Sequence, residues 1–385
     1  MTLTRLSLLL TFVLTLVLHS PAHASRMIPA APTLNASSWL LIDARTGHVI
    51  TEYNADQRLP PASLTKMMTA YIASELLLKG DLKMSDMVPI SERAWRKGGS
   101  KMFVRVGTQV PMEDLLRGII IQSGNDASIA VAEYIAGGED AFADMMNKTA
   151  ASLGMVNSHF VNATGWPAEN HYTTARDLAT LARHIIYDHP EDYALYAEKE
   201  FVYNDIRQPN RNTLLWRDST VDGIKTGHTE EAGYCLVSSA KTDDIRLVAV
   251  VMGTQSEKAR ANESQKLITY GFRFFETAKS YSAQTTLIEP EIWKGNANTI
   301  KLGTEDDIYL TIPRGAGKDV TAELDLPELL EAPIAAGQQV GTIKLTLDGD
   351  VLETRPLVAL QTVDEGGLFT RLWHWLVLLV KGWFA

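Results

Sequence analysis

Three short motifs carry the residues of this sequence that could do chemistry. In chain order they are Ser63-Leu64-Thr65-Lys66, Ser123-Gly124-Asn125 and Lys225-Thr226-Gly227. A serine hydroxyl is a weak nucleophile, and a neighbouring amine activates it by accepting its proton. Short patterns also occur by chance, so each motif alone is weak evidence. Together they predict a serine nucleophile, a lysine base, a proton relay and a substrate-holding strand, the set that acyl transfer requires.

The pattern S-x-x-K occurs twice, and its context separates the two matches. Ser63 follows Pro60-Pro61-Ala62 and opens a periodic apolar stretch, which predicts a helix start. Residues three apart share a helix face, so Lys66 would lie beside Ser63. Ser238 and Lys241 belong to a strand-like run, where residues three apart point to opposite faces. We therefore assign catalysis to Ser63 and Lys66.

Lys66 can act as a base only when it is neutral. A free lysine has a pKa of about 10.4, so neutrality near pH 7 needs a fall of about 3 units, or about 4 kcal/mol. Burial in a cleft and the positive charge of Lys225 would both lower the pKa of Lys66.

The second motif supplies a proton relay and a polar contact. Ser123 could pass a proton between Lys66 and the leaving amine, and the Asn125 amide could hold a backbone group of the substrate. Taken alone, Ser-Gly-Asn is more typical of an ordinary turn. Its position between the other two motifs favours the catalytic interpretation.

The third motif is expected at a strand end. Gly227 would let a ligand approach the backbone closely, and Lys225 and Thr226 could bind an anionic group. Backbone N–H groups at Ser63 and near His228 are candidates for stabilising the developing oxyanion. We expect His228 itself to shape the cleft rather than to carry protons.

The N-terminal residues 1–24 predict a secretory signal, which would leave a mature chain that begins at Ser25. Arg5 is the only formal charge there, an apolar run follows, and Ala22-His23-Ala24 provides small residues for cleavage. A retained membrane anchor is the alternative. Without residues 1–24 the formal net charge is −11, which argues against a nucleic-acid partner. The single cysteine, Cys235, lies in an apolar strand-like run and is expected to be a buried hydrophobe.

The order of predicted elements indicates an α+β domain over residues 25–281, with helices packed on an antiparallel sheet. A hairpin is expected at 38–51, and then helices at 113–121, 126–135 and 175–187, the last opened by a capping box at Thr174. Strands at 223–225, 233–239 and 246–252 precede a helix at 257–277. Residues 282–364 alternate short β-like runs with turns and predict a small all-β domain.

The C-terminal residues 365–385 predict an amphipathic helix that lies on a membrane surface. The stretch is rich in Leu, Val and Trp, and its few polar residues, among them Arg371, His374 and Lys381, share one sector of a helical wheel. The uninterrupted apolar core, 375–380, is far shorter than the roughly 20 residues that a membrane span needs. A helix docked on its own protein and a true transmembrane helix are the alternatives.

Longer stretches around the motifs resemble the class C penicillin-binding proteins, specifically the type-5 D-alanyl-D-alanine carboxypeptidases. They are Pro61 to Thr69, Leu116-Arg117-Gly118, Gln122 to Ala127, Val221 to Thr229 and Tyr270 to Phe275. The resemblance implies a serine β-lactamase/transpeptidase-like fold and a periplasmic enzyme held at the outer face of the inner membrane. It also implies an acyl-enzyme on Ser63, formed from the penultimate D-Ala of a peptidoglycan stem pentapeptide, and covalent inhibition by β-lactams.

By position, the resemblance implies that Arg260 helps Thr226 to bind the terminal carboxylate of the substrate. It also implies that the loop with His159 and Gly165 borders the site; this chain differs there by carrying Trp166 and Pro167. No cofactor or metal is expected, since zinc signatures such as H-E-x-x-H are absent from the sequence. A G-x-S-x-G elbow is absent too, which weakens an α/β-hydrolase assignment.

Three alternatives stay open from the sequence: a D,D-endopeptidase, a weak β-lactamase of the same fold, and a non-catalytic wall-binding scaffold. Class A β-lactamases activate water with a loop glutamate, and no E-x-x-L-N pattern occurs between Ser123 and Lys225. The intact motif residues count against a scaffold.

Overall fold

The computed structural model describes residues 28–384, with side chains up to residue 380. The predicted signal segment, residues 1–24, lies outside the described residues. Five antiparallel strands form the central sheet in the order β2-β1-β9-β8-β7. Their bounds are β1 Ser38–Asp43, β2 Val49–Tyr53, β7 Val221–Thr229, β8 Gly233–Lys241 and β9 Arg246–Thr254. The predicted hairpin therefore pairs with the last strand of the domain, which brings the two ends of the domain together.

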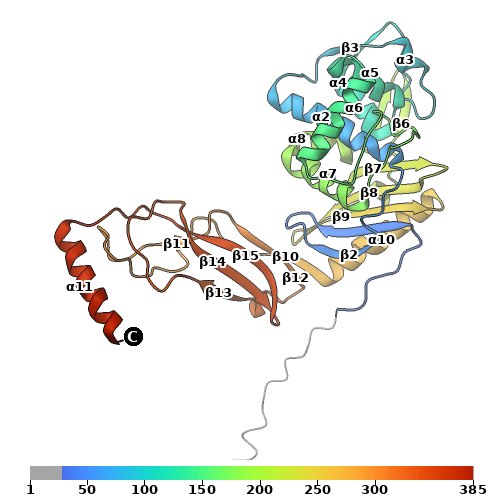
Figure 1. Cartoon of the computed structure of the whole chain (residues 1–385). Coiled ribbons are helices and arrows are strands. Elements are labelled where there is room, and N and C mark those ends of the chain that lie inside the picture. Colours follow the sequence, from blue (N-terminus) through green and yellow to red (C-terminus); the bar gives the residue numbers. More distant parts are fainter. Residues whose placement is uncertain (1–27, 385) are drawn as a thin grey trace, which may run out of the picture. The chain divides into compact units, whose positions relative to one another are not determined.

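Alternation along the strands divides the hydrophobic core into two layers. Leu40 and Ile42 of β1 pack in one cluster with the central helices, whereas Trp39 and Leu41 face the opposite layer. Helix α10 (Glu257–Phe274) covers that second face (Figure 1). The remaining helices are α2 Thr65–Lys79, α3 Glu92–Arg96, α4 Met112–Arg117, α5 Asn125–Ala136, α6 Glu139–Ser152, α7 Ala175–Asp188, α8 Pro190–Tyr193 and α9 Leu214–Arg217.

Short elements link the helices. They are the 3-10 turns η1 (Ala62–Leu64) and η3 (Ala194–Ala197), a π-helical turn η2 (Gly118–Gln122), and the strand pairs β3 (Met87–Pro89) with β4 (Gln109–Pro111) and β5 (Glu200–Tyr203) with β6 (Ile206–Pro209). The capping residue predicted for α7 is confirmed, because the Thr174 side chain accepts a hydrogen bond from the Asp177 N–H at 3.1 Å.

A second, all-β region follows α10, as predicted. A four-stranded sheet has the order β11-β15-β14-β13, and β10 pairs with β12. The bounds are β10 Phe275–Tyr281, β11 Leu302–Gly303, β12 Ile308–Pro313, β13 Thr321–Asp325, β14 Gln339–Leu347 and β15 Asp350–Ala359, with a 3-10 turn η4 at Gly317–Asp319. The predicted helix end at Thr277 is wrong: α10 ends at Phe274, because the next residues pair with β12. The domain boundary at residue 281 stays a prediction, although this pairing joins 275–281 to the second region.

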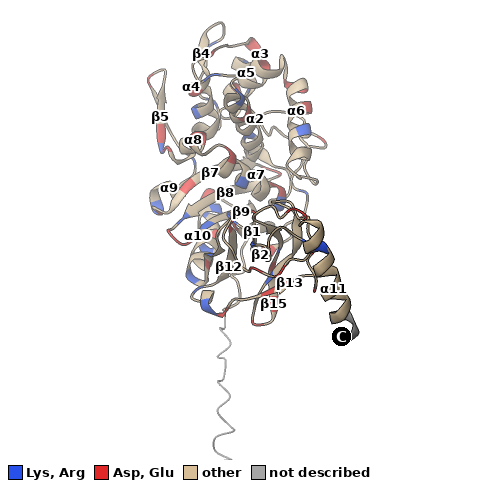
Figure 2. Cartoon of the chain, turned by 90° about the vertical axis from the view of Figure 1, so that its left-hand side faces the viewer, with Lys and Arg blue, Asp and Glu red and all other residues tan. Residues whose placement is uncertain are grey.

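Helix α11 (Leu368–Phe384) ends the described chain, in the segment predicted to be helical. Its His374 ring accepts a hydrogen bond from the Lys294 N–H at 2.7 Å and meets the Trp293 ring edge-on at 5.2 Å between centroids. Leu368, Phe369 and Trp373 are instead 81%, 91% and 66% exposed. Figure 2 shows α11 almost wholly in the colour of uncharged residues. Within residues 28–384, no helix is both long and apolar enough to cross a bilayer.

Candidate active site

Ser63 lies in the 3-10 turn η1, which runs directly into α2. The helix proper begins at Thr65, two residues later than predicted, and Lys66 follows in its first turn. The Lys66 Nζ atom and the Ser63 Oγ atom are 2.9 Å apart. The predicted contact between nucleophile and base is therefore present in the geometry.

Lys66 is fully buried, and its amine also donates to the Thr164 carbonyl at 2.5 Å. Burial is the main cause that lowers the pKa of Lys66 to about 7, and the positive charges of Arg211 and Lys97 contribute to the same fall against the opposing charge of Asp126. About half of the Lys66 amines are then neutral at pH 7.

The second cation that we expected beside Lys66 was Lys225, and this was wrong in part. The charges that lower the pKa of Lys66 belong to Arg211 and Lys97. Burial, and after it the charge of Lys66, lower the pKa of Lys225 well below its ordinary value, so the two lysines do interact, through the pKa of Lys225. Its Nζ atom donates to the Thr226 carbonyl at 3.2 Å.

Ser123 stands at the end of the π-helical turn η2, immediately before α5. Its backbone has a φ of +64°, in the left-handed region that non-glycine residues seldom adopt. The side chain is 2% exposed, and its Oγ atom has no hydrogen-bond partner among the described residues. A buried, unpaired hydroxyl costs about 1–3 kcal/mol, so an arrangement that keeps it suits a group whose partner arrives with the substrate.

Asn125 and Asp126, at the start of α5, hold one wall of the cleft. The Asn125 side chain lines the cleft and donates from Nδ2 to the Gly98 carbonyl at 2.8 Å. The Asp126 carboxylate accepts hydrogen bonds from the N–H groups of Met102, Phe103 and Val104 at 2.9–3.2 Å. One amide hydrogen of Asn125 is thus already used, which leaves its other hydrogen and its oxygen for a ligand.

The third motif lies inside β7 rather than at its end, because the strand continues to Thr229. A side chain at Gly227 would stand 3.1 Å from the Pro61 carbonyl and 3.2 Å from the Leu64 side chain. The prediction that Gly227 makes room for a ligand is therefore incomplete. The glycine allows the turn that carries the nucleophile to pack directly on the strand.

His228 lines the cleft, whereas Arg260 lies behind it. The His228 ring stacks on Tyr234 with centroids 3.9 Å apart, and the Arg260 guanidinium lies 5.7 Å from the same Tyr234 ring. Arg260 is 4% exposed and donates to the Gly227 carbonyl at 3.2 Å. It is not among the cleft-lining residues, so its role toward a substrate carboxylate stays a prediction.

The cleft has a volume of about 760 Å³, and Ser63 lies on its wall. The sequence reasoning missed the Arg211 guanidinium, an exposed cation on its wall. The two asparagines beside it fix its turn: Asn212 donates to the Gly223 carbonyl at 3.0 Å, and Asn210 accepts from the Asn212 N–H at 2.9 Å. The lining residues are Ser63, Gly99, Ser100, Asn125, Thr164, Gly165, Trp166, Pro167, Arg211, His228, Thr229, Glu230 and Glu231.

The loop before α7 contributes Gly165, Trp166 and Pro167 to the cleft wall. Gly165 adopts a φ of +81°, and a side chain there would stand 1.7 Å from the Ala62 carbonyl, so the loop touches the turn of the nucleophile. Trp166 is 45% exposed, and the Lys97 amine lies 4.7 Å from its ring centroid. His159 instead points away, with its Nδ1 atom 2.7 Å from the Asn170 carbonyl.

Among the residues that the structure describes, the acidic side chains on the cleft wall are Glu230 and Glu231, in the turn after β7. No glutamate of the loop 162–169 lines the cleft. Over residues 28–384, His, Cys, Asp and Glu side chains form no group of three or more that could hold a metal ion.

Comparison with known proteins gives a consistent result over nearly the full chain. The family model described as D-alanyl-D-alanine carboxypeptidase matches residues 25–256, and that of the penicillin-binding protein 5 C-terminal domain matches residues 275–365. The D-alanyl-D-alanine carboxypeptidase DacA of Escherichia coli is 45% identical over 98% of this chain and 97% of its own length. DacC of the same organism is 44% identical over 94% and 93%.

Solved structures agree with the sequence comparisons. Penicillin binding protein 5 from Haemophilus influenzae superimposes with a TM-score of 0.85 at 43% identity, covering 88% of this chain and all of that chain. Penicillin-binding protein D2 from Listeria monocytogenes in its ampicillin-bound form gives a TM-score of 0.59 at 26% identity, over 63% of this chain and all of that one.

Proposed function

We propose that this chain, which belongs to the D-alanyl-D-alanine carboxypeptidase family, removes the terminal D-alanine from peptidoglycan stem pentapeptides through an acyl-enzyme on Ser63. The chain is a serine hydrolase. The observation that carries the proposed mechanism is the 2.9 Å contact between Ser63 and a buried Lys66 whose pKa lies near 7.

The first half of the reaction acylates the enzyme. Neutral Lys66 accepts the Ser63 proton while Oγ forms a bond to the carbonyl carbon of the penultimate D-Ala. Backbone N–H groups at Ser63 and near His228 stabilise the oxyanion. The C–N bond then breaks, and the proton reaches the departing D-alanine amine from Lys66 through Ser123.

The second half hydrolyses the ester. Lys66, neutral again, takes a proton from a water molecule that attacks the acyl carbon. The bond from that carbon to Ser63 Oγ breaks, and the Oγ atom recovers its proton from Lys66. The released peptide is one residue shorter.

Positive charge at the cleft suits a substrate that ends in a free carboxylate. Arg211 lines the cleft, and Lys225 and Thr226 stand on the strand behind it. Arg260, whose role rests on the resemblance alone, supports that strand through the Gly227 carbonyl. We propose that these groups, with Asn125, orient the D-Ala-D-Ala end of the substrate.

A labelled penicillin and a pentapeptide ending in D-Ala-D-Ala test the proposal on the mature protein. The penicillin is expected to add covalently to Ser63, as located by mass spectrometry of peptides, and free D-alanine is expected from the pentapeptide. Ser63→Ala serves as the matched control and should do neither. Stable labelling without release of D-alanine would favour the scaffold alternative, and absence of labelling would reject the acyl-enzyme.

Inhibition by β-lactams is part of the same proposal. Structures of the Listeria relative exist in ampicillin-bound and cefotaxime-bound forms. A β-lactam presents its amide carbonyl to the same serine, and its ring opening gives the same kind of ester.

Two enzymatic alternatives receive less support. A D-alanyl-D-alanine endopeptidase of Pseudomonas aeruginosa is 35% identical but aligns with only 54% of this chain, whereas the carboxypeptidases DacA and DacC align with more than nine tenths. Fast β-lactam hydrolysis in class A enzymes uses a loop glutamate, and Glu230 and Glu231 occupy a different turn.

We propose that α11 holds the enzyme on the outer face of the inner membrane, in the periplasm. Its exposed apolar side chains support an interfacial helix rather than one docked on its own protein. Deleting residues 366–385 is expected to release the protein from lipid vesicles and to leave D-alanine release unchanged.

A milder variant tests the same face without shortening the chain. Replacing Phe369 and Trp373 by serine should weaken vesicle binding. Val351→Ser, which alters an exposed apolar residue of β15 (52% exposed), should not. Equal sedimentation of all variants with vesicles would reject α11 as the anchor.

A further inference from the structure

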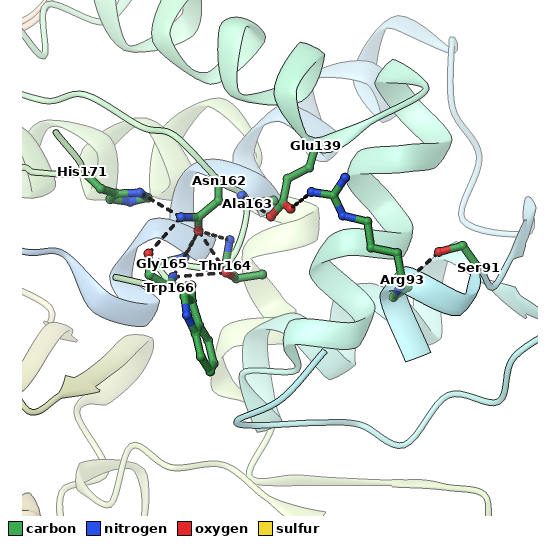
Figure 3. A network of polar contacts seen from close by, with 10 residues as sticks. Ser91, Arg93, Glu139, Asn162, Ala163, Thr164, Gly165, Trp166 and His171 are labelled. Atoms are coloured by element: carbon green, nitrogen blue, oxygen red, sulfur yellow. Dashed lines mark hydrogen bonds and ion pairs between the residues drawn. The ribbon is translucent and has the colours of Figure 1, made fainter. Parts of the chain in front are cut away.

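The loop between Phe160 and α7 contains an asparagine whose side chain folds the next four residues into a tight turn. The Asn162 Oδ1 atom accepts hydrogen bonds from the N–H groups of Thr164 (3.1 Å), Gly165 (2.8 Å) and Trp166 (3.1 Å). It also accepts from the Thr164 hydroxyl at 2.9 Å. Its Nδ2 atom closes the turn by donating to the Trp166 carbonyl at 2.9 Å (Figure 3).

This turn presents one carbonyl to the catalytic amine. The Thr164 oxygen lies 2.5 Å from the Lys66 Nζ atom, and Thr164 itself is 1% exposed. A neutral amine has two hydrogens and one lone pair. When one hydrogen is directed at the Thr164 oxygen, the lone pair has fewer directions left, and one of them faces Ser63 Oγ, 2.9 Å away.

The same asparagine is tied to the helix that carries Lys66. Its Nδ2 atom lies 3.3 Å from His171 Nδ1, which also accepts from the Val161 N–H at 3.4 Å. Burial lowers the pKa of His171 to about 4, so the ring is neutral, and Nε2 carries the hydrogen that points to the Thr65 hydroxyl at 2.8 Å. Thr65 directly precedes Lys66.

A separate set of contacts fixes the residue between Asn162 and Thr164. The Ala163 N–H donates to Glu139 at 3.2 Å, and the Ala163 carbonyl accepts from the Thr69 hydroxyl at 2.8 Å. Glu139 pairs in turn with Arg93 at 2.6 Å (Figure 3). Ala163 is therefore held by α2 and α6, and the orientation of the Thr164 carbonyl depends on the turn that follows.

We propose that Asn162 is a positioning residue for acyl transfer: its side chain holds the Thr164 carbonyl against the Lys66 amine and closes the loop over that amine against water. The inference rests on the proposed function, because it assigns Asn162 a role in the reaction on Ser63. Asn162 touches no reacting atom and acts through Thr164.

The pH dependence of acylation separates this role from general support of the loop. Burial is the main cause of the low pKa of Lys66, so a loop that admits water should raise that pKa. The charged groups around the amine stay in place in an Asn162 variant: they are Asp126 on α5, Lys97 after α3, Lys225 on β7 and Arg211 before α9, with His171 neutral.

The experiment measures the rate of acylation by a labelled penicillin between pH 5 and pH 10. Asn162→Leu, which keeps the size but not the acceptor, is expected to be slower at pH 7 by roughly tenfold or more. Its half-maximal rate should move to higher pH by about one unit. Asn162→Ser can form a similar but weaker turn, so it should recover most of the rate and of the midpoint.

Asn147→Leu is the matched control. The Asn147 side chain also fixes the backbone of this loop: it donates to the Phe160 carbonyl and accepts from the Phe160 N–H, both at 2.8 Å. It does not hydrogen-bond to the turn at 164–166. Asn147→Leu should reach its half-maximal acylation rate at the same pH as the parent protein, even if it lowers the melting temperature.

The possible outcomes distinguish failure of the proposed role of Asn162 from failure of the proposed function. The proposed role of Asn162 would be overturned if Asn162→Leu reached its half-maximal acylation rate at the same pH as the parent protein. It would also be overturned if Asn147→Leu shifted that pH by the same amount. Failure of the parent protein to label at Ser63 would instead reject the proposed function.

Discussion

Replacing Lys66 by methionine is expected to abolish acylation and yet to stabilise the protein at pH 7. Burial, with the charges of Arg211 and Lys97, lowers the pKa of Lys66 from 10.5 to about 7, a fall that corresponds to about 5 kcal/mol of free energy. Methionine fills a similar volume without a charge. It leaves the Thr164 carbonyl unpaired, which costs about 1–3 kcal/mol, so the net gain in unfolding free energy at pH 7 is about 2–4 kcal/mol.

The gain should depend on pH in a defined direction. The unfolded chain keeps the Lys66 proton up to about pH 10.5, whereas the folded chain loses it near pH 7. Between these values the unfolded state binds more protons, so the stability of the parent rises with pH across the window. The advantage of Lys66→Met is therefore greatest at and below pH 7 and disappears toward pH 10.5.

Melting temperatures at pH 7 and pH 10 provide the assay. A gain of about 3 kcal/mol corresponds to roughly 6–12 °C for a domain of this size. Lys79→Met is the matched control: it changes a lysine at the other end of α2 that is 59% exposed, and it should give little change at either pH. An equal effect of Lys66→Met at both pH values would refute burial as the source of the neutral amine.

Three further outcomes follow from the site. Acylation of the parent should be half-maximal near pH 7 and fall about tenfold per pH unit below it, because the neutral fraction of Lys66 does so; a flat profile of penicillin labelling from pH 5 to 9 would contradict this. Ser123→Ala should slow D-alanine release by about 10²–10⁴-fold and raise the melting temperature, since the variant loses no hydrogen bond and removes a buried, unpaired hydroxyl that costs about 1–3 kcal/mol; undiminished release would reject the relay. Gly165→Ala should cost about 1–3 kcal/mol in unfolding free energy and slow acylation, because its new carbon would overlap the Ala62 carbonyl; a denaturant titration unchanged from the parent would exclude that clash.

The sequence predicted the parts of the site that depend on local spacing. The contact between Ser63 and Lys66 follows from a three-residue separation at a helix start, and a strand that holds Lys225 follows from its apolar neighbours. The sheet with flanking helices and the all-β second region were also predicted correctly from the order of periodic segments.

Contacts between distant segments were out of reach of that reasoning. Lys97 and Arg211 act on Lys66 through their charges, and Thr164 contacts it through its carbonyl; the three come from separate loops, and none belongs to a recognisable motif. The close approach at Gly227 involves the Pro61 turn, more than 160 residues earlier, so the sequence alone suggested a ligand instead.

The end of α10 shows a different limit of the same reasoning. The aromatic residues at 270–275 fit a helical period and also a strand. Pairing with β12, rather than any local signal, ends the helix at Phe274.

The thiol of Cys235, the single cysteine of the chain, can report how often the central sheet opens. The side chain is fully buried in β8, and burial raises the pKa of its thiol to about 11. An alkylating reagent needs both access and thiolate, so it should modify the native protein only as fast as the central sheet separates. The rate of alkylation would therefore measure how often β8 becomes exposed in the intact enzyme, and how strongly a bound β-lactam suppresses that exposure.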